Sequence, residues 1–302
     1  METIATAEPA AEGPPPPAFP PAHEAGGAVP QGCGCGAGNA ADLPPSYVYA
    51  LGRIEMRFPS LGVEREVAQA LGREATAGLT DRQALHAALA QPQNRYLLRQ
   101  LCWVLSIEGL DTYLLVPRDP LGHDLLLQAV RTEPEPADVD VIIGSRGPIA
   151  PPGLCNGLQV PVVAFDQVYS FDRAALLGSI PRPASVPEDQ DKQFRAAAAE
   201  LLDRLLQLAD NAGATDEHRA VNYLAVRYPT IYATAAEAHA RNASLTGVEV
   251  RPSRLSGTRS IVDVIFSFGN RQTDVTEKFF ARVDVTEEFP FLVTRMSPFY
   301  DR

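Results

Sequence analysis

The chain has 302 residues, of which 45% are hydrophobic, enough for one large or two ordinary domains. Its formal net charge of −11 makes it a poor electrostatic partner for nucleic acids and anionic membranes, and we expect it to bind neither. No apolar run is long enough to span a bilayer, and the N-terminus lacks the basic and apolar regions of a signal peptide. We therefore expect a cytoplasmic protein.

Residues 1–46 contain ten prolines, seven glycines, five acidic residues and neither Lys nor Arg. Such a segment buries too little apolar surface to offset the entropy lost on ordering, so we predict a disordered acidic tail. Within it, Cys33 and Cys35 offer two ligands to a soft metal ion, whereas zinc needs four. We favour a linker over a metal site, and four cysteines in a chain this long do not predict a disulfide framework.

Residues 47–178 have the alternation of elements expected of a mixed α/β domain. Aromatic, β-branched and nearly continuous apolar runs indicate strands at 47–58, 99–109, 110–117, 139–144 and 161–171. A tight turn at Glu108-Gly109 is expected between two of these strands. The segment 145–157 reads as a long Pro/Gly loop.

Capping residues indicate three helices in the same domain. Ser60 is expected to begin a short helix that ends near Gly72. Thr80 and Gln83 form a predicted capping box for the next helix. Asp119 and the proline after it indicate the start of a third helix.

A second domain is predicted at residues 185–302, in which helices precede an antiparallel sheet. Apolar residues recur with helical spacing over 187–213. Another helix is expected to begin after Thr215 and to be interrupted by Pro229. After Gly247 the apolar period changes to two, which indicates strands at 264–268, 278–286 and 289–296. The whole chain is therefore predicted to have an α+β fold.

The sequence lacks the arrangements that common catalytic sites need. None of the five histidines lies in a glycine-flanked turn, and no nucleophile elbow or phosphate-binding loop follows a strand. We therefore predict no catalytic residues and no cofactor. Cys102, His123 and Cys155 would form a metal site only if the fold brought them together. The apolar run around Cys102 instead favours a small buried thiol.

Four polar residues in and near the segment 145–157 are candidates for ligand binding. They lie around predicted strand ends, where binding residues concentrate: Arg146, Asn156, Asp166 and Gln167. The alternative is a loop ordered by its own polar groups.

Several long strings resemble the C-terminal region of PatG-type cyanobactin maturation proteases. They include YVYALGRIEMRFPSLGVERE, QNRYLLRQLCWVLSIEGLDTYLLVPRDP, VIIGSRGPIAPPGLCNG, VVAFDQVYSFD, HRAVNYLAVRYPTIYATAAE and the closing TDVTEKFFARVDVTEEFPFLVTRMSPFYDR. The resemblance covers residues 47–302. It implies the non-proteolytic accessory region that follows a subtilisin-like protease in proteins that process and macrocyclise ribosomally made peptides. No histidine here precedes glycine and no Gly-Thr-Ser turn occurs, so none of the protease's catalytic residues carries over.

Three functions are compatible with these observations. The first, which we favour, is a noncatalytic module that binds a precursor peptide or a peptide-processing enzyme. The second is an enzyme with an unfamiliar site around Arg146, Cys155 and Asp166. The third is a structural partner that forms a homodimer through exposed sheet edges.

Overall fold

The computed structural model describes residues 46–72, 78–135, 138–182, 187–206, 210–273 and 275–300. The predicted acidic tail, with Cys33 and Cys35, lies outside the described residues except for its last residue. As predicted, the fold is α+β, with helices and two separate sheets. In the described part of the chain, no helix has both the length and the apolar character needed to cross a membrane.

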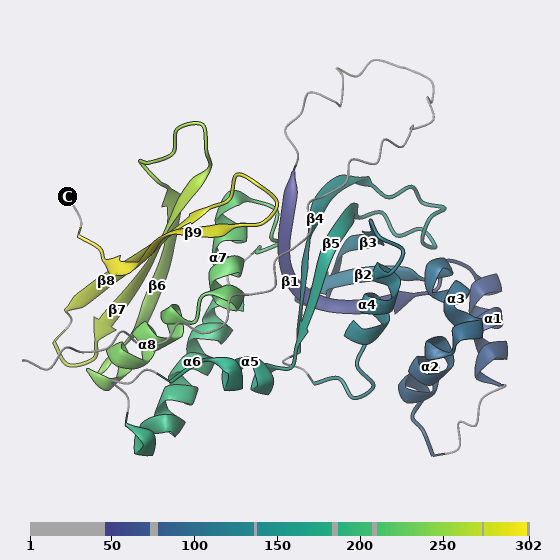
Figure 1. Cartoon of the computed structure of the whole chain (residues 1–302), viewed down its shortest axis with the longest axis horizontal. Helices are drawn as coiled ribbons and strands as arrows, with labels where there is room; N and C mark the ends of the chain where they lie inside the picture. The colour runs from purple at the N-terminus through teal and green to yellow at the C-terminus, as the bar shows by residue number, and fades with distance from the viewer. Residues whose placement is uncertain are drawn as a thin grey trace, which may run out of the picture. The chain divides into compact units, whose positions relative to one another are not determined.

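Five strands in the described residues close into a barrel in the order β1-β2-β3-β5-β4 (Figure 1). The strands are β1 (Tyr47–Arg57), β2 (Cys102–Ile107), β3 (Leu110–Pro117), β4 (Val139–Ile149) and β5 (Pro161–Phe171). Neighbouring strands are antiparallel except β3 and β5, which are parallel.

Strand β1 closes the barrel because it pairs with two partners in succession. Residues 47–52 pair with β4, and residues 53–57 pair with β2. Gly52 lies where the partner changes. A Cβ at Gly52 would lie 2.5 Å from the carbonyl oxygen of Ser106, so the close approach of the two backbones there requires glycine.

Local signals in the first half form as predicted. Glu108 and Gly109 have φ values of 52° and 80°, the backbone of a two-residue turn that matches the twist of the β2–β3 hairpin. Ser60 caps α1 (Leu61–Leu71), and Thr80 with Gln83 forms the capping box of α2 (Asp81–Ala90). The remaining helices of this half are η2 (Pro92–Asn94), α3 (Arg95–Gln100), α4 (Gly122–Ala129) and α5 (Arg173–Ser179).

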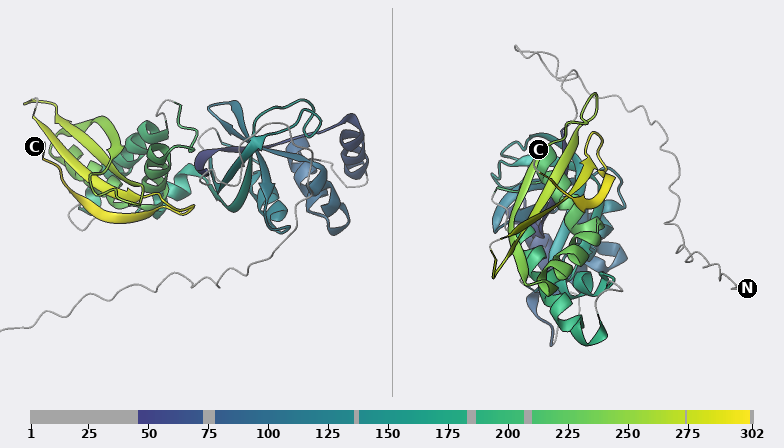
Figure 2. Two further views of the ribbon diagram at one scale, coloured as in Figure 1. Left: turned by 90° about the horizontal axis from the view of Figure 1, so that it is seen from above. Right: turned by 90° about the vertical axis from the view of Figure 1, so that its left-hand side faces the viewer.

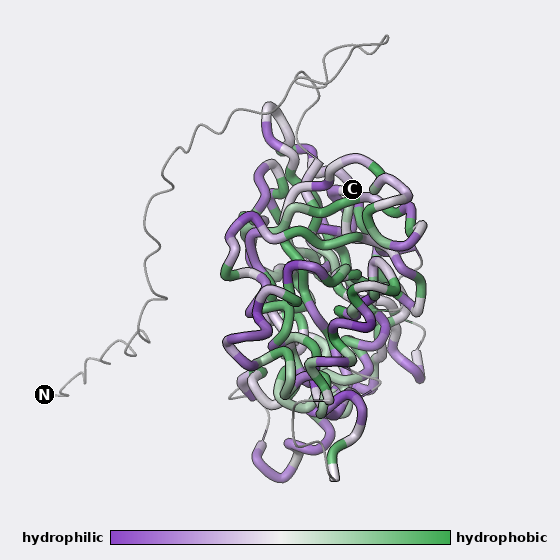
Figure 3. Tube along the Cα trace, turned by 90° about the vertical axis from the view of Figure 1, so that its right-hand side faces the viewer, coloured by the Kyte–Doolittle hydropathy of each residue, from purple (hydrophilic) through white to green (hydrophobic). Residues whose placement is uncertain are grey.

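Apolar side chains from every barrel strand and from α1–α4 fill the barrel core. Its largest member, Trp103, is fully buried and donates through Nε1 to the carbonyl oxygen of Leu98 at 2.8 Å, so its one polar atom is satisfied. In Figure 3 the stretches of the trace that run through the interior are mainly hydrophobic and many peripheral stretches are hydrophilic. Burial of each such side chain contributes about 1.5–3 kcal/mol to stability.

The second half has helices on one face of a four-stranded antiparallel sheet, as predicted (Figures 1 and 2). Its elements are η3 (Glu188–Gln190), α6 (Asp191–Leu206), α7 (Asp216–Arg227), α8 (Thr230–Ala240), β6 (Ala243–Pro252), β7 (Ile261–Asn270), β8 (Thr276–Asp284) and β9 (Phe291–Pro298). On β8, Ala281 and Val283 are buried in the core shared with these helices. Because strand side chains alternate, Phe280 and Arg282 lie on the opposite face.

The segment that joins α6 to α7 binds the backbone of β1. Asn222 on α7 donates through Nδ2 to the carbonyl oxygen of Tyr49 at 2.8 Å, and the Tyr49 amide donates to the carbonyl oxygen of Gly213 at 2.9 Å. Asn211 donates through Nδ2 to Oδ1 of Asn222 at 2.6 Å. These buried bonds connect the barrel to the helices of the second half.

Several predicted boundaries were wrong, among them those of the helix predicted over 187–213, which is α6 at Asp191–Leu206. Strand β4 continues through Ile149 into the predicted loop, because Arg146 and Ile149 pair with β5 across a register shift. Residues 99 and 100, predicted as strand, complete helix α3. The helix predicted after Asp119 begins at Gly122, since the Asp119 carboxylate accepts from the Leu121 amide in a turn. Strand β6 was not predicted; it begins at residue 243, before Gly247, which lies at an irregularity in the pairing.

Candidate functional site

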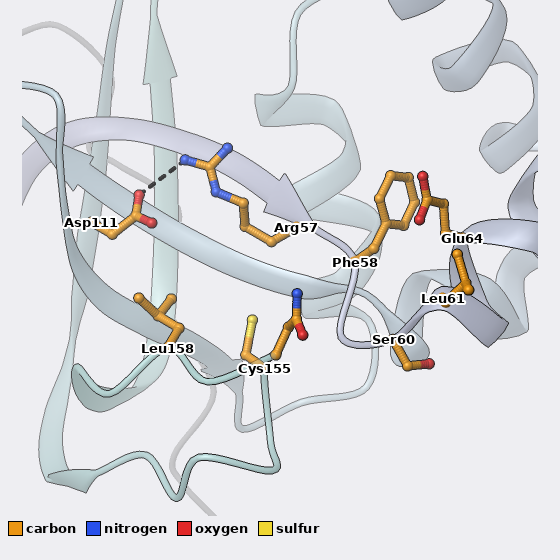
Figure 4. A pocket seen from close by; sticks show the side chains of 9 residues that line it. Arg57, Phe58, Ser60, Leu61, Glu64, Asp111, Cys155 and Leu158 are labelled. Carbon is orange, nitrogen blue, oxygen red and sulfur yellow. Dashed lines mark hydrogen bonds and ion pairs between the residues drawn. The ribbon is translucent and has the colours of Figure 1, made fainter.

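A pocket of about 460 Å³ opens between three segments of the barrel half (Figure 4). The end of β1 and the start of α1 contribute Arg57, Phe58, Ser60, Leu61 and Glu64; β3 contributes Asp111; the β4–β5 loop contributes Cys155, Asn156 and Leu158. One residue predicted for ligand binding, Asn156, therefore lies in this pocket.

Arg57 is held at the pocket by two carboxylates. Its Nη2 lies 3.1 Å from Oδ1 of Asp111 and 2.8 Å from Oε2 of Glu55. The hydrogen bond that Arg57 donates to Asp111 raises the pKa of Arg57 above its ordinary value, so the guanidinium stays charged. Among the described residues its Nε and Nη1 have no hydrogen-bond partner, which leaves them available to a ligand. Sequence reasoning missed Arg57 and Asp111, although charged residues on predicted strands are a usable signal.

A disulfide between Cys102 and Cys155 anchors the β4–β5 loop to strand β2 beside the pocket, with a Cα–Cα distance of 5.9 Å. The prediction that Cys102 is a small buried thiol was wrong, because its sulfur is bonded to that of Cys155. This single bond was not predicted, although it is not the disulfide framework that the sequence argued against. Spacing alone could not pair two cysteines 53 residues apart. Because disulfides persist mainly in oxidising compartments, this bond does not support the expected cytoplasmic location, which stays a prediction.

The β4–β5 loop is held by its own backbone as well as by the disulfide. The Gly157 amide donates to the carbonyl oxygen of Pro152 at 2.8 Å, and the Ala150 amide to that of Val160 at 2.8 Å. Asn156 and Gly157 both have positive φ, at 45° and 87°. Asparagine tolerates this backbone better than most residues, so the turn presents the Asn156 amide at a fixed place in the pocket.

The other three predicted binding residues are not part of this pocket. Arg146 lies exposed on β4 near Tyr113, and its backbone amide donates to the carbonyl oxygen of Ser46 at 2.7 Å. Gln167 accepts a short hydrogen bond from the hydroxyl of Tyr169. Asp166 forms an ion pair with Arg118, at 3.2 Å between Oδ2 and Nη1. The four candidates therefore do not form one site.

Asp166 belongs to a second polar cluster, which sequence reasoning missed. Arg118 donates through Nη2 to the hydroxyl of Ser145 at 2.6 Å and lies 4.0 Å from Oε2 of Glu288. Burial, followed by the hydrogen bond and negative charge of Asp166, raises the pKa of Glu288 to about 7. The β5 strand and the β8–β9 loop thus bring two carboxyl groups together around one arginine.

Within the described ranges, no group of three or more His, Cys, Asp or Glu side chains is arranged to hold a metal ion. Cys102 and Cys155 are joined to each other, while the ring of His123 lies against the carbonyl oxygen of Pro120 at 3.2 Å. Cys33 and Cys35, the other pair considered, lie outside the described residues.

The strand order and the position of the pocket resemble a known class of barrel. Five-stranded Greek-key barrels of the oligonucleotide- and oligosaccharide-binding class hold ligands against strands 2 and 3, between the loops that join strands 1–2 and 4–5. Here the pocket is lined by β3 and by the same two connections. It therefore occupies the position where such barrels bind ligands. Because a fold does not determine a function, the ligand class must be argued from the lining residues.

Comparison with known proteins identifies the second half. Residues 188–299 match the family model described as PatG C-terminal. The expectation of a PatG C-terminal region is therefore confirmed. The match spans η3 through β9, the helices and the antiparallel sheet of this region.

A solved structure described as "PatG Domain of Unknown Function" has the same fold, with a TM-score of 0.69 and 23% sequence identity over 84% of this chain and 98% of that chain. Its coverage extends well beyond the PatG C-terminal region. A search of curated proteins gives no match. The chain is thus similar to a PatG-related domain of unknown function, which is consistent with a place in a cyanobactin-type pathway.

Proposed function

We propose that this chain is a noncatalytic recognition module of a cyanobactin-like pathway and that it binds an extended segment of a ribosomally made precursor peptide. The observation that carries the proposal is the pocket between the β1–β2 connection and the β4–β5 loop, at the ligand-binding position of this class of barrel. The PatG C-terminal match supports the pathway.

The lining of the pocket suits a peptide better than a nucleic acid. Phe58, Leu61 and Leu158 offer apolar surface, and Leu61 is 58% exposed. Such mixed apolar and polar lining is typical of sites that hold a side chain while a few polar groups orient the backbone.

The polar groups of the pocket match the hydrogen-bonding groups of a peptide backbone. Arg57 has donors free for a carbonyl oxygen, and Asn156 offers both a donor and an acceptor. Two carboxylates, Glu64 and Asp111, lie in the same pocket against one arginine. That balance disfavours a phosphate backbone, which needs an excess of positive charge.

The contacts of Cys155 argue against the alternative of an enzyme built on Arg146, Cys155 and Asp166. Its sulfur is joined to that of Cys102, so it is not a thiolate nucleophile while the disulfide is intact. Asp166 is paired with Arg118, and Arg146 lies near Tyr113. Each of the three side chains therefore has a different environment.

The test is fluorescence anisotropy with the full chain and labelled synthetic peptides that together span a cyanobactin-type precursor peptide. We expect at least one peptide to bind saturably, and Leu61→Asp to weaken that binding by about tenfold, which corresponds to about 1.4 kcal/mol. The matched control is Leu121→Asp, because Leu121 is 68% exposed and does not line the pocket.

Binding of none of the peptides would contradict the proposal, as would equal loss in both variants. If a processing enzyme binds the chain and Leu61→Asp does not weaken that binding, the result would favour a processing enzyme over the precursor peptide as the partner. A homodimer in light scattering that Leu61→Asp dissociates would assign the pocket to self-association.

A further inference from the structure

A second cavity, of about 340 Å³, lies on the sheet of the PatG C-terminal region and is rich in arginine and aromatic residues. It is lined by Arg251, Pro252, Arg254, Asp263, Arg282, Phe299 and Tyr300, which we call the arginine pocket. Arg251 and Arg282 come from β6 and β8, on the sheet face opposite α6–α8. None of these residues belongs to the barrel pocket.

Stacking contacts fix the arginines in place. The guanidinium carbon of Arg251 lies 4.9 Å from the ring centroid of Phe299, and that of Arg282 lies 4.7 Å from the ring centroid of Phe280. The two rings contact each other edge to face at 5.7 Å. Arginine stacked on an aromatic ring keeps its in-plane donors free for another group.

The donors that remain free point to an anionic ligand. Arg282 uses only Nε internally, toward Asp263 at 2.8 Å and Ser253 at 3.2 Å. Its Nη atoms have no hydrogen bond among the described residues. Arg254 is exposed and has neither an ion pair nor a hydrogen bond within the described part of the chain. Three guanidinium groups thus line the pocket: Arg251 is paired with Glu249 at 3.5 Å and Arg282 with Asp263 at 2.8 Å, while Arg254 is paired with no carboxylate of the described residues.

This concentration of positive charge stands out because the chain as a whole carries a formal charge of −11. Guanidinium groups bind carboxylates through paired hydrogen bonds, and Tyr300, 79% exposed, adds an uncovered aromatic ring beside them. We propose that the arginine pocket binds an acidic peptide segment of a partner protein, through its Asp or Glu carboxylates. This docking site is separate from the pocket proposed for the precursor.

The net charge of the chain favours a peptide over a nucleic acid as the ligand. A nucleic acid would bring a continuous row of phosphates against a chain whose formal net charge is −11. A short peptide can place one or two carboxylates at the arginines without that repulsion. Its binding should weaken as salt rises, because the contacts are charge-assisted and partly exposed.

The test uses the full chain and a labelled synthetic peptide of alternating Glu and Gly, with an alternating Lys and Gly peptide and oligothymidylate as the other probes. We expect saturable binding of the Glu peptide alone, weakened about tenfold or more in the double variant Arg251→Ala with Arg254→Ala. The matched control is Arg241→Ala, since Arg241 is similarly exposed and paired with Glu277 but does not line the pocket.

Three outcomes would overturn the proposal: no saturable binding of the Glu peptide, equal weakening in the double variant and in Arg241→Ala, or tighter binding of oligothymidylate. The variant Leu61→Asp, which alters the barrel pocket, is tested with the same Glu peptide. It should leave binding of the Glu peptide unchanged, so that failure of the barrel pocket and failure of the arginine pocket give different results.

Discussion

At the scale of the single residue, two glycines in similar open space allow the effect of backbone strain on stability to be measured separately from the effect of packing. Gly109 and Gly153 both have no atom within 4 Å of where a Cβ would lie, but only Gly109 has a positive φ, of 80°. We expect Gly109→Ala to lower the free energy of unfolding by about 1–2 kcal/mol, and Gly153→Ala to leave it unchanged or slightly higher. Urea unfolding of both variants measures this. Equal effects would show that the β2–β3 turn does not have this backbone.

Glu288 makes stability depend on pH. Its pKa in the folded chain, about 7, lies above the value of an ordinary glutamate. The folded state therefore holds the proton of Glu288 more tightly than the unfolded state, so the contribution of Glu288 to stability is complete below its ordinary pKa and is lost as pH rises through about 7. Glu288→Gln removes the titrating group. We expect it to raise the free energy of unfolding relative to the parent at about pH 8, with little difference at about pH 4.

The control for Glu288 is Glu249→Gln, an exposed glutamate that pairs with Arg251 on the sheet surface. Its effect should be small and nearly the same at both pH values, because exposed pairs contribute little. If Glu288→Gln raised the free energy of unfolding equally at both pH values, the result would contradict the raised pKa of Glu288.

Sequence reasoning found part of the candidate site at this scale. Asn156 was identified because it follows a Pro/Gly stretch near a strand end, and that signal is local. The partners of Asp166 were not identifiable, because Glu288 comes from the β8–β9 loop and only the folded chain brings the two carboxyl groups together. The Cys102–Cys155 pair was missed for the same reason.

The disulfide constrains the β4–β5 loop, which is an element of the proposed peptide site. The two cysteines are 53 residues apart in the sequence, and the disulfide restricts the unfolded chain between them. From this chain entropy, we expect loss of the disulfide to lower the free energy of unfolding by about 4 kcal/mol. The comparison is urea unfolding of the parent with and without reductant, and of Cys102→Ala with Cys155→Ala. We expect the double variant to be insensitive to reductant and about as stable as the reduced parent.

The tail cysteines provide the control for this measurement. A variant with Cys33→Ser and Cys35→Ser should lose the same stability on reduction as the parent. A parent chain whose stability is unchanged by reductant would contradict a disulfide between β2 and the β4–β5 loop.

An element was predictable from the sequence when the interactions that form it join residues that are close in the sequence. The Ser60 cap, the Thr80–Gln83 box and the turn at Glu108-Gly109 depend on neighbouring residues, and all were predicted. Closure of the barrel depends on β1 exchanging one partner for another at Gly52, which no local pattern encodes. Tertiary pairing likewise extended β4 to Ile149 through a stretch whose composition indicates a loop.

At the scale of the whole molecule, buried amides join the barrel to the PatG C-terminal region. The side chain of Asn222 donates to the carbonyl oxygen of Tyr49 and accepts from the side-chain amide of Asn211. Asn222→Ala would therefore leave that buried carbonyl and that buried amide without these partners. We expect a loss of about 2–3 kcal/mol. Asn270→Ala, at the half-buried end of β7, should cost less, because its side chain donates to the carbonyl oxygen of Arg241 at an exposed position.

Because of these contacts, residues 46–300 should unfold in one calorimetric transition, and Asn222→Ala should lower its midpoint. Two transitions in the parent, with Asn222→Ala affecting neither, would mean that the halves are energetically independent.

The central claim is that the chain holds a precursor peptide in the barrel pocket without altering its covalent structure. Hydrogen–deuterium exchange of the full chain with the tightest-binding precursor peptide, read by mass spectrometry, measures both parts at once. We expect slower exchange at the segments that line the pocket, 57–64 and 155–158, and a recovered peptide whose mass is unchanged once its deuterium has been exchanged back in H2O. Slower exchange confined to other segments, or a peptide whose mass has changed, would contradict the claim.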